Sequence, residues 1–308
     1  MRPWHLLTLF LQFCLMGCKA DNSPAQHKHD GKMVVVATTG MIADMVQNIT
    51  GDQAKVFCLM GSGVDPHSYE PRESDVTKIL EAQLVVYNGL HLEGKMSDLL
   101  EQSNKKGNFI ALAQALEKSD LRFENNEPDP HIWFDVQLWK KCSAFVTEKI
   151  ASMRPEMADE VRKNGGKYME KLEALDKDIR AKISTIPPTQ RVLITAHDAF
   201  GYFGKAYGFE VRGVQGISTV SETSNQEIAN LAKFMVERKI RAFFVENSVS
   251  RKNLEKLKEV VGTISKDFSV REGGELYSDA LGPPKSLAST YEGMIRHNLE
   301  SITKGLAP

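Results

Sequence analysis

The stretch Met157–Ser184, MADEVRKNGGKYMEKLEALDKDIRAKIS, predicts a single long helix in the middle of the chain. Its apolar residues recur at the spacing of one helix face, and they are Met157, Val161, Tyr168, Leu172, Leu175, Ile179 and Ile183. Pro155 suits a helix start, and Pro187 marks a stop. A helix over residues 157–184 would be about 42 Å long at ~1.5 Å per residue, enough to run the height of two small lobes.

Gly165 stands at a position of this apolar stripe and is followed by Gly166. Each glycine weakens a helix by up to ~1 kcal/mol relative to alanine, so a bend could form at the pair. A coiled coil is the alternative interpretation, but the stripe covers too few heptads to favour it.

Predicted strands and helices alternate on both sides of the long helix. Before it, we predict strands at 32–39, 55–60, 84–88 and 109–112 and helices at 41–49, 74–82 and 97–104. After it, we predict strands at 191–195, 209–214, 242–246 and 274–277 and helices at 199–207, 225–238, 251–262 and 289–304. Such alternation indicates βαβ units with parallel strands. The predicted fold class is α/β, with two lobes, each a parallel-type sheet flanked by helices, linked by one long rigid helix.

Composition supports two domains and excludes some functions. The chain has 308 residues, of which 42% are hydrophobic and 26% charged, as in soluble globular proteins. The formal net charge is −1, so the chain lacks the excess of basic residues that is typical of a nucleic-acid binder. No apolar run of about 18 residues follows the N-terminal segment, which excludes a polytopic membrane protein. We expect an N-terminal lobe at 33–156, an interdomain backbone helix at 157–184 and a C-terminal lobe at 185–308.

The N-terminus carries an export signal. Arg2 precedes a short apolar core, and Leu15–Cys18 resembles the lipobox of bacterial lipoproteins, with Met16 where Ala or Ser is more usual. We expect a signal peptide with a possible lipobox at 1–18 and a flexible tether at 19–32. Lipidation of Cys18 would hold a periplasmic protein at a membrane, and an ordinary signal peptide or an uncleaved anchor is the alternative. His27 and His29 are interpreted as solvated residues of the tether.

Candidate metal ligands stand near the ends of predicted strands. His67 follows the strand that ends at Met60, His197 lies between a strand and a helix, and Asp279 follows the last strand. His131, in the segment DPHIWFD, is also expected to lie just past a strand. Ligand crevices of open α/β sheets lie outside the carboxyl ends of strands, so a site shared by both halves would occupy the cleft between lobes.

Three imidazoles and one carboxylate suit a borderline metal. They match a tetrahedral or five-coordinate Zn²⁺ site and also suit Mn²⁺ if the carboxylate binds bidentately, whereas Ca²⁺ would require mostly oxygen ligands. Each histidine taken singly is weak support, because a loop or core histidine is more often structural. The spacing matches no local motif such as His-Glu-x-x-His.

Seven ordered motifs then resemble the zinc/manganese-binding proteins of bacterial ABC importers, the TroA-type class of solute-binding proteins. They are residues 65–71 (DPHSYEP), 84–93 (LVVYNGLHLE), 129–133 (DPHIW), 197–203 (HDAFGYF), 216–222 (GISTVSE), 245–247 (VEN) and 278–282 (SDALG). The resemblance runs from about residue 33 to 304. It implies two α/β lobes joined by one rigid helix, with the metal held between them.

The resemblance also implies the ligands and the partners. Carried over residue by residue, the metal ligands are His67, His131, His197 and Asp279. Manganese-selective members usually have Glu at the position of His197, and the His-rich loop of many zinc members is missing, since Leu121–Pro130 contains no histidine. Zn²⁺ or Mn²⁺ is therefore expected as the transported ligand, with the choice left open. The implied partner is an ABC permease in the cytoplasmic membrane, and we expect a monomer that binds no nucleic acid.

Two other functions are weighed against metal import. A metallohydrolase would keep an open water position and a nearby general base, whereas four ligands would fill this site. An extracellular adhesin is suggested only by export and tethering. The non-enzymatic import function accounts for more of the motifs than either alternative.

Residues near the motifs have open roles. Glu246 could orient a ligand as a hydrogen-bond acceptor or make a structural hydrogen bond. Trp133, Tyr69 and Tyr202 could wall the cleft, although packing alone also explains them. His91 and His297 are interpreted as surface or packing residues.

Overall fold

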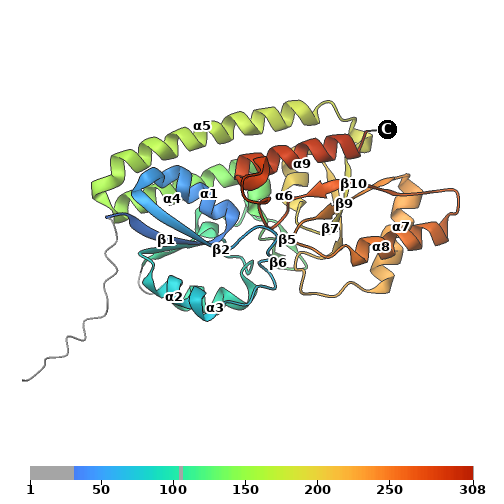
Figure 1. Ribbon diagram of the computed structural model, residues 1–308. Helices are drawn as coiled ribbons and strands as arrows, with labels where there is room; N and C mark the ends of the chain where they lie inside the picture. Colours follow the sequence, from blue (N-terminus) through green and yellow to red (C-terminus); the bar gives the residue numbers. More distant parts are fainter. Residues whose placement is uncertain (1–30, 104–106, 308) are drawn as a thin grey trace, which may run out of the picture. The chain divides into compact units, whose positions relative to one another are not determined.

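The computed structural model describes residues 31–103 and 107–307 (Figure 1). The predicted signal segment 1–18, including Cys18, and His27 and His29 of the predicted tether lie outside the described residues. Within the described ranges, no helix is both long enough and apolar enough to cross a membrane.

The first half of the chain forms a parallel sheet of strand order β2-β1-β3-β4. Its strands are β1 (Met33–Thr39), β2 (Ala54–Met60), β3 (Leu84–Tyr87) and β4 (Phe109–Ala111). The connecting helices are α1 (Gly40–Thr50), α2 (Glu73–Glu81) and α3 (Ser97–Ser103). Every residue of β1 is buried, because Val35 faces a core shared with α1 and Val36 faces a second core shared with α2 and α3.

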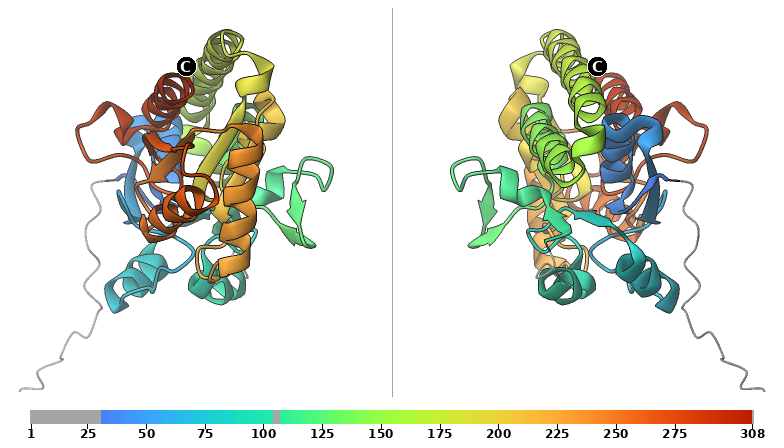
Figure 2. Two further views of the ribbon diagram at one scale, coloured as in Figure 1. Left: turned by 90° about the vertical axis from the view of Figure 1, so that its right-hand side faces the viewer. Right: turned by 90° about the vertical axis from the view of Figure 1, so that its left-hand side faces the viewer.

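The second half forms parallel strand pairs covered by helices. Strand β7 (Val192–His197) pairs with β8 (Glu210–Gln215), and β9 (Ala242–Glu246) pairs with β10 (Arg271–Leu276). The helices are α6 (Gly201–Tyr207), α7 (Asn225–Arg238), α8 (Lys252–Ile264) and α9 (Tyr291–Gly305). Figure 2 shows the same elements from two sides. The predicted α/β class with parallel sheets flanked by helices is confirmed.

Helix α5 (Ala158–Ile183) is the predicted long helix, and it runs beside α4 (Val136–Met153) and α9 (Figure 1). It continues through Gly165 and Gly166 without a break. A Cβ on Gly165 would lie 2.4 Å from Thr147 Oγ1 of α4, whereas Gly166 has no atom within 4 Å of such a Cβ. Gly165 therefore allows the two helices to approach closely, and the glycine marks a contact instead of a bend.

One cluster of buried apolar side chains joins the two halves. It extends from Met33 of β1 along the predicted stripe of α5 to Ile302 of α9, and it includes Phe244 of β9. A short hairpin, β5 (Phe123–Glu124) and β6 (Glu127–Pro128), precedes the segment of His131 and was not predicted. Its strands are two residues long and have no apolar alternation, so the sequence pattern gives no strand signal there.

Two strand bounds differ from prediction by more than one residue. Strand β7 continues to His197, so this histidine is the last strand residue and does not follow the strand. Strand β10 begins at Arg271 instead of residue 274. Among the residues that the structure describes, β10 is bonded on one side only, to β9, with a shift in register between Glu272 and Gly274. Such an edge strand can begin with polar residues.

Candidate metal centre

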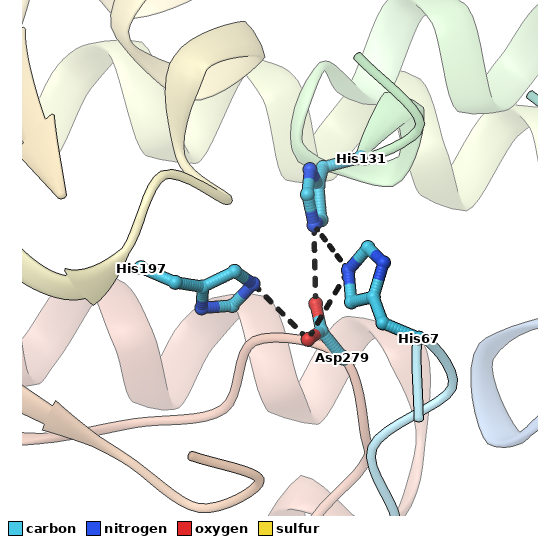
Figure 3. Close-up of side chains that lie close together, drawn as sticks. All are labelled: His67, His131, His197 and Asp279. Carbon is cyan, nitrogen blue, oxygen red and sulfur yellow. Dashed lines mark hydrogen bonds and ion pairs between the residues drawn. The ribbon is translucent and has the colours of Figure 1, made fainter. Parts of the chain in front are cut away.

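The fold brings the four predicted ligands together. One candidate ligand atom from each of His67, His131, His197 and Asp279 lies within 4.8 Å of the other three, and all four residues are buried (Figure 3). His67 lies on the loop between β2 and α2, and Asp279 lies on the loop after β10. His67, His197 and Asp279 lie at strand ends of the parallel sheets or on the loops just after them, as expected. His131 instead follows β6 of a short antiparallel hairpin, a strand that was not predicted.

The donor atoms face one another at short range. His67 Nε2 lies 3.3 Å from His131 Nε2, and His197 Nε2 lies 3.1 Å from Asp279 Oδ2. His131 Nε2 lies 3.5 Å from Asp279 Oδ1. Both Asp279 oxygens and His197 Nε2 are buried without a hydrogen-bond partner, since the 3.1 Å approach lacks hydrogen-bond geometry. Buried polar atoms without partners are rare, so their convergence fits the coordination of a metal ion.

Two carboxylates orient two of the imidazoles. Glu246 Oε2 accepts from His197 Nδ1 at 2.6 Å, and Asp129 Oδ1 accepts from His131 Nδ1 at 2.8 Å. Each contact leaves Nε2 turned toward the centre and makes the imidazole a stronger donor. Of the two roles left open for Glu246, the structure therefore shows the orienting one. Asp129 was missed as an orienting residue, although its position two residues before His131 was a signal.

Aromatic residues close part of the site. The Trp133 ring packs edge-on against His131 with centroids 5.3 Å apart, and its Nε1 donates to Ser278 O at 3.0 Å. Tyr202 Oη donates to the backbone oxygen of Asp129 at 3.0 Å. Trp133 and Tyr202 thus border the site, whereas Tyr69 Oη bonds to Asp75 of α2, away from it.

The remaining histidines of the folded region lie outside the cluster. His297 packs on Tyr277, with centroids 4.6 Å apart, and its Nε2 contacts Glu275 O. His91 is exposed, with a φ of 62°. Both therefore match their interpretation as surface or packing residues.

Burial and neighbouring charges shift the pKa values of three of the four candidate ligands. Burial alone would raise the pKa of Asp279, but the three surrounding imidazoles outweigh it and hold that pKa well below its usual range. Burial alone would lower the pKa of His197, but Asp279 and Glu246 outweigh it and raise that pKa well above its usual value. Burial lowers the pKa of His67 to about 4, despite the attraction of Asp279. A bound metal requires neutral imidazoles, because the coordinating nitrogen must be free of a proton.

A cavity of about 440 Å³ borders the cluster, and His67 is the only one of the four residues in its wall. The ionisable residues of that wall, within the described part of the chain, are His67, His91, Glu124, Glu127, Glu222 and Glu227. Acidic walls raise the local concentration of cations.

Comparison with known proteins identifies the class. The family described as zinc-uptake complex component A, periplasmic (ZnuA) matches residues 35–305, and the chain belongs to this family. It is a substrate-binding protein of the transport class and not an enzyme, as the motifs predicted.

Particular relatives cover nearly the whole chain. The manganese-binding lipoprotein MntA of Bacillus subtilis (strain 168) is 44% identical over 300 residues, 97% of each chain. The zinc-binding protein TroA of Treponema pallidum (strain Nichols) is 43% identical over 279 residues, 90% of each. A solved structure of the periplasmic zinc-binding protein TroA from Treponema pallidum matches with a TM-score of 0.87 and 42% identity, over 90% of this chain and 100% of that one. The predicted TroA-type resemblance is confirmed.

Proposed function

We propose that this protein captures Zn²⁺ or Mn²⁺ outside the cytoplasmic membrane and delivers it to an ABC permease. The ion would be bound by His67, His131, His197 and Asp279. The observation that carries the proposal is the convergence of four buried donor groups, of which His197 Nε2 and both Asp279 oxygens have no hydrogen-bond partner in the protein. Cysteine is absent from this donor set and hard oxygen ligands are in the minority, which favours a borderline metal.

The choice between the two metals rests on the ligands. Three imidazoles favour zinc, because manganese is the weakest binder of the Irving–Williams series. Overall sequence similarity does not decide between the two metals, because the manganese-binding relative is 44% identical to this chain and the zinc-binding relative is 43% identical. We propose zinc as the tighter ligand, with manganese accepted at the same centre.

The proposal also covers the domain arrangement, the oligomeric state and the membrane attachment of the protein. We propose that residues 33–156 and 185–308 act as two lobes, with the backbone helix limiting their relative movement. The protein would act as a monomer that binds no nucleic acid, tethered to a membrane through its N-terminus. A permease can promote release only by binding the open state more tightly than the closed one.

The test measures metal content of the purified protein, followed by zinc-versus-manganese competition after chelation. We expect one bound equivalent, lost in the double variant His67→Ala/Asp279→Ala and retained in His297→Ala, which alters a histidine outside the cluster. Circular dichroism would verify that the double variant is folded. No metal and no uptake after chelation would reject the proposal. Metal-dependent hydrolysis lost in His67→Ala would favour a hydrolase, and matrix binding that survives metal removal would favour an adhesin.

A further inference from the structure

The four candidate ligands are anchored unequally. The segment of His131 is joined to the second half of the chain by three buried hydrogen bonds: Trp133 Nε1 to Ser278 O at 3.0 Å, Tyr202 Oη to Asp129 O at 3.0 Å, and Tyr291 Oη to Trp133 O at 2.7 Å. His197 belongs to a strand, and its backbone N–H donates to Glu246 Oε1 at 3.0 Å. These ligands are held from several sides.

The loop of His67, residues 61–72, has a single such link. Apart from the contacts between the candidate ligands themselves, Thr219 Oγ1 to Asp65 Oδ2, at 2.6 Å, is the only hydrogen bond or ion pair that joins this loop to the second half within the described residues. Asp65 and Thr219 are both partly exposed. Across the two halves, the loop of His67 is thus held by one partly exposed hydrogen bond, whereas the segment of His131 is held by three buried ones.

Each end of the Asp65–Thr219 hydrogen bond is linked to the backbone that carries one of the candidate ligands. Asp65 Oδ1 accepts from the backbone N–H of His67 at 2.9 Å, so the same carboxylate fixes the histidine. Thr219 O accepts from Gln215 Nε2 at 3.3 Å. Gln215 pairs with His197 in the register of β7 and β8. The Asp65–Thr219 hydrogen bond thus connects the backbone that carries His67 to the strand that carries His197.

We propose that Asp65 and Thr219 are a positioning pair: their hydrogen bond holds His67 against the other three ligands, and its opening is the first step of metal release. The inference rests on the proposed function. A hydroxyl donating to a carboxylate makes a strong hydrogen bond, but here a single bond joins the loop of His67 to the second half, where the segment of His131 has three. His67 also borders the cavity, so its departure opens the centre toward that space.

The experiment measures the rate of zinc release into an excess of a chromophoric chelator by stopped flow, with the full chain loaded with zinc. Thr219→Val removes the hydroxyl at nearly constant shape, and we expect release about tenfold faster. Thr219→Ser retains the hydroxyl, and we expect a rate within about twofold of the unchanged protein. The matched control is Thr223→Val, which loses a hydrogen bond to Val214 O within the same segment, and we expect no change in rate.

Asp65→Asn is an independent second variant, and we expect it also to accelerate release. Urea unfolding of the metal-free variants separates a positioning role from a general loss of stability. Thr219→Val and Thr223→Val each lose one hydrogen bond and should be destabilised to a similar extent, whereas only Thr219→Val should release zinc faster. The positioning role would be overturned if Thr219→Val released zinc at the wild-type rate. It would also be overturned if Thr223→Val accelerated release as much as Thr219→Val does. Failure of the unchanged protein to take up zinc would instead overturn the proposed function, so the two results are distinguishable.

Discussion

Glu246 and His197 form the shortest contact of the orienting carboxylates around the metal centre, with 2.6 Å between Oε2 and Nδ1. Glu246 also accepts from the backbone N–H of His197, so one buried carboxylate satisfies both donors of this residue. The contact fixes the ring and leaves Nε2 as the only nitrogen available to a metal.

The variant Glu246→Gln should weaken zinc binding by about tenfold to a hundredfold. Glutamine offers one oxygen in place of two, so one of the two N–H groups of His197 would face an amide NH₂. Competition with a chromophoric chelator measures the affinity. Glu272→Gln, which alters an exposed ion pair with Arg251, is the control and should bind as the wild type does. Unchanged affinity in a folded Glu246→Gln protein would contradict the orienting role.

His197→Glu should shift preference from zinc toward manganese. A carboxylate oxygen replaces an imidazole nitrogen, which weakens binding of the softer ion more than that of the harder one. The measurement is the ratio of the two affinities in competition, because both ions can lose absolute affinity. A ratio equal to that of the wild type would show that position 197 does not set selectivity.

The two adjacent glycines of α5 should respond with opposite signs. Gly165→Ala places a Cβ 2.4 Å from Thr147 Oγ1, and the repacking should cost about 1–3 kcal/mol of unfolding free energy. Gly166→Ala meets open space and should gain up to ~1 kcal/mol from helix propensity. Urea unfolding of the metal-free protein measures both, and each variant controls for the other. Equal effects would mean that the contact between α4 and α5 is not tight.

Asp44 of α1 should make stability depend on pH. Burial raises its pKa to about 6, although the backbone N–H of Tyr291 and the charge of Lys171 oppose this. The unfolded carboxyl has a pKa near ~3.9. Ionising Asp44 therefore costs folding free energy, and the cost is absent below the unfolded pKa and complete above the folded one.

Asp44→Asn removes this cost and keeps an oxygen for Tyr291 N–H. The variant should be more stable than the wild type by ~1–2 kcal/mol near neutral pH, with no advantage near ~pH 4. Urea unfolding at the two pH values tests this. A difference that does not change with pH would assign the effect to another cause.

Much of the fold followed from apolar periodicity. Helix α7 and strand β9 have the bounds predicted from the sequence, and the stripe of α5 is the face that it buries. The hairpin of β5 and β6 and the polar start of β10 could not be predicted this way, because their stability comes from hydrogen bonds to a neighbouring strand and not from burial.

The candidate ligands were predictable because strand ends converge at one edge of a parallel sheet. The contacts that hold these ligands in place were not predictable in the same way. Glu246 was one of two open possibilities, and nothing in the sequence places Thr219 beside Asp65, which is 154 positions away. The Asp65–Thr219 contact depends on how loops from opposite halves meet, which local patterns do not encode.

The continuous apolar cluster from β1 through α5 to α9 limits which exchanges of sequence with a relative this protein could tolerate in evolution. Each half has its own strands, yet residues of both complete the same interior. Neither half alone would bury its share of that interior, so the chain should unfold as a single cooperative unit. A recombination that exchanged one half with that of a relative would have to preserve the helix surface that both halves share.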